Sequence, residues 1–275
     1  MPDIVPAIIP ATIATVIEAN INAYLLSFAR VPGATPHHDP QSVWIDSGRS
    51  DSTFNSVVSA RFSPDTVDAQ IESVLAHFQR HARPLTWHIG PSSTPSDLGR
   101  ILLAHGLTHS EDEPGMAVEL SNMREDITAP SGLEVETVRD AGGLEDWVAI
   151  WLFPVPAEIR QSVLEVLRVR GVGADLPWRY YVGRIGGRPV ACSELFVGEG
   201  TASVQYVVTL PEMRRQGIGA AMTLHVLREA REIGYRVGVL TASPDGIGIY
   251  RRIGFQDYCW FRRYEWSPSE ESAKP

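Results

Sequence analysis

Two arginines and two glycines stand close together in the C-terminal half of the chain. The stretch Tyr206–Met222 (YVVTLPEMRRQGIGAAM) begins with β-branched residues and contains Arg214, Arg215, Gly217 and Gly219. A glycine lets the backbone approach an anion closely because no Cβ intervenes. The free N–H groups and the dipole of a helix that starts here would attract the same anion. The pattern favours a pyrophosphate-binding loop over the alternative, a tightly packed helix start with solvated arginines.

Two better-known phosphate motifs do not fit this stretch. A P-loop requires Gly-Lys-Ser/Thr, and none follows here. The dinucleotide fingerprint G-x-G-x-x-G would need glycine at position 222, where the chain has Met222. The anion would therefore be held by another arrangement of strand, turn and helix.

Hydrophobic periodicity predicts the elements that must position this loop. Glycine turns separate three strands, which predicts an antiparallel meander made of Trp178–Ile185, Pro189–Val197 and Ala202–Leu210. We expect a strand and two helices before the meander, at Leu133–Val138, Leu144–Phe153 and Ala157–Arg168. After the loop we expect an amphipathic helix, a strand, a short helix and a last strand, at Ala220–Ile233, Val237–Thr241, Ile247–Ile253 and Tyr258–Trp266.

Two motifs in these elements resemble those of the GNAT acetyltransferase superfamily. Arg214-x-x-Gly217-x-Gly219 matches the family pattern Q/R-x-x-G-x-G/A. Further on, the segment Ser243–Phe255 (SPDGIGIYRRIGF) is similar to the second family signature, a short helix ending Leu-Tyr-x-x-x-Gly-Phe. The resemblance covers roughly residues 133–266, and the predicted strand order is that of the family.

The resemblance implies acetyl-CoA as the cosubstrate and assigns the residues that would bind it. The backbone of Val207, Val208 and Thr209 would pair with the pantetheine arm. The pyrophosphate would be held by the loop residues Arg214, Arg215, Gln216, Gly217, Ile218, Gly219 and Ala220. Ser243 stands where many members have asparagine, and it could still cap the helix or bind the cosubstrate.

Tyr250 occupies the family position whose hydroxyl protonates the departing CoA thiolate. A phenol has an ordinary pKa of about 10, so it is protonated at neutral pH and can donate. The other interpretation is an aromatic anchor that packs beside Ile249 and Ile253.

The resemblance further implies direct attack of a neutral amine on the thioester in a ternary complex. Positioning and a backbone N–H near Val208 would supply much of the rate acceleration. Glu194 is the first candidate for the general base and Glu199 the second, while the alternative for both is a solvated strand or turn residue. Gln205 cannot serve, so the base stays open.

Other side chains admit two interpretations. Trp147 and Trp151 are four residues apart on an expected helix and would line an acceptor pocket or pack in the core. His37 and His38 lie in a proline-rich loop without other ligands nearby in sequence, so no metal is expected there.

The N-terminal half repeats the same order of elements. Expected are a strand, a helix, a strand, a helix and a closing strand, at Thr53–Phe62, Val67–Gln79, Leu85–Ile89, Ser96–Ala104 and Met116–Leu120. When the two halves are aligned at the prolines 64 and 211, Val67 corresponds to Arg214, Gln70 to Gly217 and Glu72 to Gly219. When they are aligned at the Gly-Leu and Gly-Phe pairs, Leu102 corresponds to Tyr250. This half therefore lacks every group that would bind a pyrophosphate.

The repeat predicts an α/β (α+β) fold of tandem GNAT-like domains, each a mixed, mostly antiparallel sheet flanked by helices. We expect a degenerate, non-catalytic domain at 1–125, a catalytic domain at 131–266 and a flexible tail at 267–275, with a linker within Ser121–Gly132.

Composition limits the remaining possibilities. The net charge of −9 argues against a general nucleic-acid binder. The N-terminus lacks the basic region of a signal peptide, and no apolar run is long enough to span a bilayer, so we expect a cytoplasmic protein without membrane partners. The expected substrate is a small primary amine or a peptide N-terminus, with a homodimer left open. A non-catalytic acyl-CoA sensor and a scaffold protein are the alternative functions.

Overall fold

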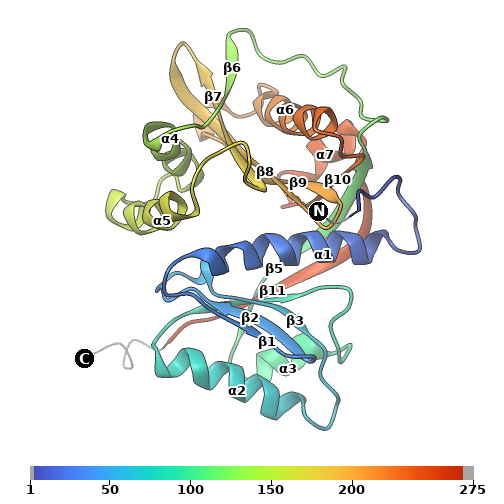
Figure 1. The fold of residues 1–275 in the computed structure, drawn as a ribbon, viewed down its shortest axis with the longest axis vertical. Helices are drawn as coiled ribbons and strands as arrows, with labels where there is room; N and C mark the ends of the chain where they lie inside the picture. The colour runs from blue at the N-terminus through green and yellow to red at the C-terminus, as the bar shows by residue number, and fades with distance from the viewer. Residues whose placement is uncertain (1–2, 269–275) are drawn as a thin grey trace. The chain divides into compact units, whose positions relative to one another are not determined.

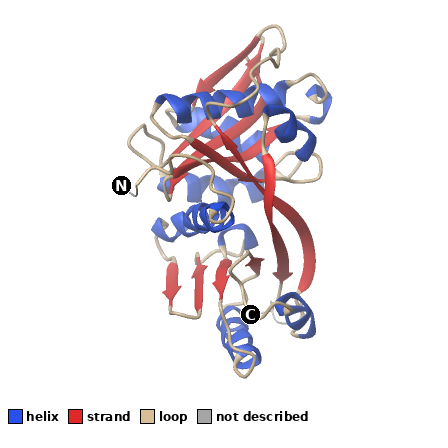
Figure 2. Cartoon of the chain, turned by 90° about the vertical axis from the view of Figure 1, so that its right-hand side faces the viewer, coloured by secondary structure: helices blue, strands red, loops and turns tan. Residues whose placement is uncertain are grey.

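Contacts divide the chain into two compact units, each built from separate segments of the sequence. The computed structural model describes residues 3–268. The C-terminal unit comprises the residues up to Asn20 together with Met116–Tyr258. The N-terminal unit comprises Ile21–Gly115 and the described residues from Cys259 onwards. Figure 1 labels the elements, and Figure 2 shows helices and strands by colour. The predicted tail at 267–275 lies almost wholly outside the described residues.

The sheet of the C-terminal unit contains the predicted antiparallel meander. Its strand order is β6-β7-β8-β9-β10, with the end of β5 beside β10. The first four strands pair antiparallel and β10 pairs parallel to β9. The bounds are β5 Thr108–Glu119, β6 Leu133–Thr137, β7 Trp178–Ile185, β8 Arg188–Gly198, β9 Thr201–Thr209 and β10 Val237–Thr241. The mixed, largely antiparallel sheet flanked by helices confirms the predicted fold class.

Helices lie on both faces of this sheet. Tyr180 and Tyr181 are neighbours on β7 and point to opposite faces, as alternation in a strand requires. The ring of Tyr180 packs against Trp147 of α4, while that of Tyr181 packs against His225 of α6. The helices of this unit are α4 Ala141–Trp151, α5 Ala157–Arg170, α6 Ile218–Glu232 and α7 Ile247–Ile253. The buried side of α6 includes the periodic apolar residues Leu224, Leu227 and Ala230, whereas Ile233 at its C-terminal end is exposed.

The N-terminal unit repeats this order on a smaller scale. Its strand order is β1-β2-β3-β4-β11, antiparallel except for the parallel pair β3–β4. The bounds are β1 Thr35–His38, β2 Ser42–Asp46, β3 Ser56–Ala60, α2 Val67–Arg80, β4 Leu85–Ile89, α3 Leu98–Ala104 and β11 Gln256–Trp266. The sequence did not predict β1, β2 or the helix α1 (Ile13–Leu26), which begins in the C-terminal unit and ends in the N-terminal one.

The closing strands are exchanged between the two halves of the sequence. β5 closes the N-terminal half in sequence, yet its last residues lie beside β10 in the C-terminal unit. β11 closes the C-terminal half, yet its residues 262–266 pair with β4 in the N-terminal unit. The structural division therefore differs from a cut near residues 125–131, because each unit takes one strand from the other half.

The segment expected to be a linker, Ser121–Gly132, lies inside the C-terminal unit. Glu125 accepts hydrogen bonds of 2.7 Å from both Arg228 and Arg231 on α6. The bonds from Arg228 and then Arg231 hold the pKa of Glu125 below its usual value. Ile127 packs against the core of the same unit. Among the described helices, none is long and apolar enough to cross a membrane.

The end of α2 follows a well-defined pattern of hydrogen bonds. Ala82 has φ +48°, in the left-handed region. Its N–H donates to the carbonyl of Gln79 at 3.0 Å, and the N–H of Arg83 donates to that of Phe78 at 3.1 Å. These two bonds form a Schellman motif, which usually has glycine at the left-handed position. The turn brings Arg83 back towards the end of β2.

Replacing Ala82 with glycine should stabilise the protein. Left-handed backbone costs an L-residue about 1–2 kcal/mol, and the greater freedom of glycine in the unfolded chain offsets part of this gain. We expect the free energy of unfolding to rise by about 0.5–1 kcal/mol. Ala76→Gly in the exposed interior of α2 is the matched control and should lower it by about 1 kcal/mol. Urea unfolding measures both, and equal signs for the two variants would contradict this account.

Candidate active site

Strand β9 parts from its parallel neighbour β10 near the middle of its length. The two strands pair at Ala202–Gly238 and Ser203–Val239. Beyond these pairs β9 continues to Thr209 along β8 alone. Tyr206 has φ +48°, and the register between β8 and β9 shifts at the same place. An extra residue in one strand bends that strand and increases its twist, so this bulge accounts for the divergence.

The loop after β9 has the backbone geometry of an anion site. Gly217 is the N-cap of α6 with φ +83°, and Arg215 has φ +64°. The N–H of Ala221 donates to the carbonyl of Gly217 at 3.0 Å and closes the first helical turn. The N–H groups of the preceding three residues have no carbonyl within the helix to bind, as at every helix start. Arg215 itself is exposed at this helix end.

Gly219 lies where β9, α6 and α7 converge. A Cβ at this position would lie 3.4 Å from Ile249 Cδ1, 3.8 Å from Thr209 Oγ1 and 3.9 Å from Val207 Cγ1. The first turn of α6 is thus beside the end of β9 that has left β10, and the pantetheine-binding role expected of that strand stays a prediction. A side chain at 219 would occupy the space between these elements.

Tyr250 lies in the same region, on α7. Its side chain is buried, and its ring packs edge-on against Phe255 with centroids 5.9 Å apart. A Cβ at Gly246 would lie 2.7 Å from Cε2 of Tyr250. The ring therefore occupies space over the start of α7 that only a glycine leaves open. Ser243 precedes this helix and is exposed.

The remaining predicted loop residues are at the surface. Arg214 and Gln216 are exposed, whereas Ile218 and Ala220 face the core with their side chains. The Nε of Arg214 donates to the carbonyl of Thr209 at 3.1 Å, which ties the loop to the end of β9. The backbone of all these residues, rather than their apolar side chains, is what the loop can offer an anion.

Glu194 lies in a buried polar cluster. Its Oε1 accepts a 2.7 Å hydrogen bond from Nη1 of Arg170, and both side chains are fully buried. The same Nη1 donates to the hydroxyl of Tyr180 at 2.7 Å, and the guanidinium stacks over Trp178 at 4.1 Å. Burial, and next the charge of Glu194, raise the pKa of Tyr180. A carboxylate held this way does not suit a general base, which must exchange protons with substrate or solvent.

Glu199, the second candidate base, lies in the turn between β8 and β9 and is exposed. Val208 is seven positions after Thr201 on β9, so the two residues are roughly 23 Å apart in an extended strand. Glu199 is therefore far from the strand end where the thioester would lie.

Three aromatic rings gather on the α4 face of β9. Trp151 is 4.3 Å from Tyr206 between ring centroids, and Trp147 is 5.7 Å from the same ring. Trp147 is fully buried and donates from Nε1 to the carbonyl of Ser193 at 2.9 Å. The sequence had singled out both tryptophans but missed Tyr206, because a bulge leaves no mark in hydrophobic periodicity.

The N-terminal unit lacks the loop as well as its side chains. Three residues lead from Pro64 to the start of α2 at Val67, whereas seven lead from Pro211 to the start of α6 at Ile218. The residue-by-residue match counted from the prolines therefore fails at the helix start. Leu102, set against Tyr250 by sequence, is fully buried.

The comparisons with known proteins agree with this geometry. Residues 177–257, which contain the loop and α7, match the family model of the acetyltransferase (GNAT) domain. No curated protein matches the chain.

Solved structures resemble the chain over nearly its whole length. A GCN5-related N-acetyltransferase from Kribbella flavida has a TM-score of 0.72 at 22% identity, covering 94% of this chain and 96% of its own. One from Sphaerobacter thermophilus has a TM-score of 0.59 at 17% identity, covering 98% of each chain. A tandem GNAT protein from the clavulanic acid biosynthesis pathway has a TM-score of 0.58 at 14% identity, covering 94% of this chain and 95% of its own. These likenesses show the tandem fold.

Replacing Glu194 with glutamine should destabilise the protein rather than remove a catalytic group. The buried Arg170 would lose its counter-charge, and breaking a buried pair costs about 3–5 kcal/mol. Urea unfolding measures the loss, and Glu199→Gln in the exposed turn should change stability by less than about 0.5 kcal/mol. Unchanged stability with abolished activity in Glu194→Gln would restore the base assignment.

Proposed function

We propose that the protein acetylates a primary amine, because residues 177–257 match the family model of the GNAT acetyltransferase domain. Acetyl-CoA is the donor, and a small molecule or a peptide N-terminus is the acceptor. The amine attacks the thioester directly while both substrates are bound. The observation that carries this proposal is the convergence of β9, the start of α6 and α7 around Gly219.

The residues present fit the diphosphate of acetyl-CoA. The free amides of the first turn of α6 and the left-handed backbone at Gly217 supply directed N–H donors without a Cβ in the way. Arg214 and Arg215 add positive charge at the same helix end. The backbone of Val207–Thr209, no longer paired with β10, supplies hydrogen-bonding groups for the amides of the pantetheine arm.

The chemical step relies on positioning and on Tyr250. A backbone N–H near Val208 polarises the thioester carbonyl, and the phenol of Tyr250 gives its proton to the departing thiolate. In this proposal the attacking nitrogen loses its proton to water, since Glu194 is buried against Arg170 and Glu199 lies in the distant β8–β9 turn. The N–C bond forms, the C–S bond breaks, and free CoA and the amide leave.

The N-terminal unit has no catalytic part in this proposal. It lacks the four-residue extension that precedes α6, so it offers no loop for a second diphosphate. We expect one acetyl-CoA to bind per chain.

Tyr250→Phe should separate catalysis from binding. Loss of a general acid lowers kcat by about 10²-fold or more, while the Kd for acetyl-CoA should stay within about twofold, a negligible change in binding free energy. Thiol release on a panel of amines measures the first quantity and isothermal titration the second. Tyr235→Phe, at the far end of α6, is the control. A protein that binds acetyl-CoA but acetylates no amine would be a sensor instead.

Gly217→Ala should weaken acetyl-CoA binding specifically. Gly217 and Gly234 both have positive φ, +83° and +103°, at the two ends of α6. Alanine at either position strains the backbone by about 1–2 kcal/mol. Only the change at Gly217 reorients the loop amides. The Kd of Gly217→Ala for acetyl-CoA should therefore rise about tenfold, which is roughly 1.4 kcal/mol of binding free energy. Equal Kd values for Gly217→Ala and Gly234→Ala would refute the phosphate site.

A further inference from the structure

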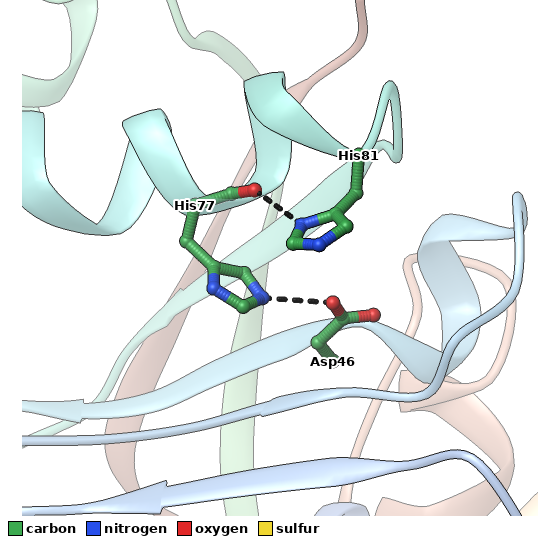
Figure 3. A group of neighbouring side chains, drawn as sticks. All are labelled: Asp46, His77 and His81. Atoms are coloured by element: carbon green, nitrogen blue, oxygen red, sulfur yellow. Dashed lines mark hydrogen bonds and ion pairs between the residues drawn. The ribbon is translucent and has the colours of Figure 1, made fainter.

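Two histidines and an aspartate converge in the N-terminal unit, in a cluster that the proposed function does not use. His77 lies in the last turn of α2, and His81 is the C-cap of that helix. Four residues apart, they share one face of the helix. Asp46 is the last residue of β2, directly opposite. One ligand atom from each side chain lies within 4.8 Å of the other two (Figure 3).

The tautomer of His81 is fixed by the backbone. Its Nδ1 lies 2.8 Å from the carbonyl oxygen of His77. A carbonyl only accepts hydrogen bonds, so Nδ1 carries the proton and the lone pair is on Nε2. Figure 3 shows this second nitrogen on the side of the ring that faces Asp46 and His77. Metal-binding histidines usually have this arrangement, with the other ring N–H donated to a carbonyl or carboxylate.

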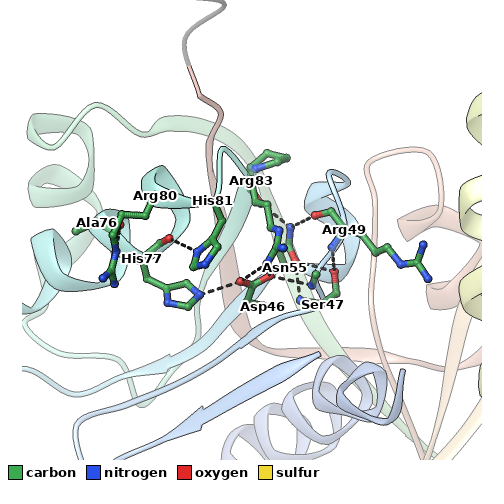
Figure 4. Close-up of polar contacts among 11 residues, drawn as sticks. Asp46, Ser47, Arg49, Asn55, Ala76, His77, Arg80, His81 and Arg83 are labelled. Carbon is green, nitrogen blue, oxygen red and sulfur yellow. Dashed lines mark hydrogen bonds and ion pairs between the residues drawn. The ribbon is translucent and has the colours of Figure 1, made fainter. Parts of the chain in front are cut away.

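Four hydrogen bonds fix the orientation of the Asp46 carboxylate. It is 2% exposed, and Oδ1 accepts hydrogen bonds of 2.9 Å from the N–H of Gly48 and from Nη1 of Arg83 (Figure 4). Oδ2 accepts from Nε2 of His77 at 2.8 Å and from Nη1 of Arg83 at 2.7 Å. Burial alone would raise the pKa of Asp46, but these bonds more than compensate and lower it.

The ring of His77 is fixed by its neighbours as well. It packs against Trp44 with ring centroids 4.7 Å apart, and Trp44 also stacks with His37 at 4.6 Å. The three side chains of the cluster are therefore oriented before any ligand arrives, which lowers the ordering cost of binding.

We propose that Asp46, His77 and His81 bind a divalent transition-metal ion, with Zn²⁺ as the best match. Two imidazole nitrogens and one carboxylate oxygen form a common zinc ligand set, with water in the fourth position. The ion takes the place of the proton between His77 Nε2 and Asp46 Oδ2, and His77 stays neutral because its single ring proton moves to Nδ1 by exchange with solvent. Hydrogen bonds from Gly48 to Asp46 and from His81 to the His77 carbonyl then act as supports behind the ligands.

Arg83 sets the strength of this site. Its guanidinium neutralises Asp46 without a metal and would stand beside the bound cation, so it opposes binding. We therefore expect micromolar rather than nanomolar affinity. The ion would join the end of α2 to the end of β2 within the N-terminal unit, and this role is independent of the proposed acetyl transfer.

Isothermal titration of the tag-free full chain with ZnCl₂ tests the proposal. We expect one ion per chain and a loss of affinity of about 10-fold or more in His81→Ala. His81 is exposed, so this variant should fold normally. His109→Ala is the matched control, because His109 is also an exposed histidine paired with an aspartate, Asp112, in the same unit. Equal affinity of His81→Ala and His109→Ala, or no binding by the unmodified chain, would overturn the site.

A second variant tests the ligand from β2 without removing the buried carboxylate. Arg83→Gln keeps a donor near Asp46 but removes the opposing charge, so Zn²⁺ should bind several-fold more tightly. Visible absorption of the Co²⁺-loaded protein should show the intense bands of a tetrahedral site in both the unmodified chain and this variant. Unchanged or weaker binding in Arg83→Gln would overturn the assignment of Asp46 as the third ligand.

Discussion

The divergence of β9 from β10 is the constraint on which the active site depends. Alternation along a strand would place Val204 and Val207 on opposite faces of the sheet. Both instead pack with the α6 side of the core, because the bulge at Tyr206 adds one residue between them. The same bulge points Tyr206 towards α4 and its tryptophans. One extra residue thus accompanies the separation of β9 from β10 and places an aromatic ring on the α4 side of the sheet.

The buried pair of Glu194 and Arg170 lies in the sheet and helices that carry these aromatic residues. It joins β8 to the end of α5, while Trp147 joins α4 to the carbonyl of Ser193 on β8. Both α4 and α5 are therefore anchored to β8, the strand that is paired with the bulged β9. In this arrangement a charged residue in the middle of a sheet has a structural role, which is why the proposed acyl transfer does not use Glu194 as the base.

Local signals made most of the C-terminal unit predictable. Glycine turns and periodic apolar residues placed β7, β10 and α7 within their observed bounds. The turn before α6 was recognisable because Gly217 and the arginines stand at a fixed spacing, and its role in binding phosphate stays a prediction. The partner of Glu194 was not visible, since Arg170 is far away in sequence and meets it only through packing. The exchange of strands was hidden for the same reason: β5 and β11 have ordinary strand patterns, and nothing local specifies which neighbour each will join.

That exchange makes the two halves of the gene product mutually dependent. Without β5, strand β10 would become an open edge with unpaired N–H and C=O groups, and without β11 the same would happen to β4. Neither half can be lost or separated while the other keeps a complete sheet. The N-terminal half of the sequence thereby has a structural role whatever its chemistry: it supplies β5, the strand beside β10 in the C-terminal unit.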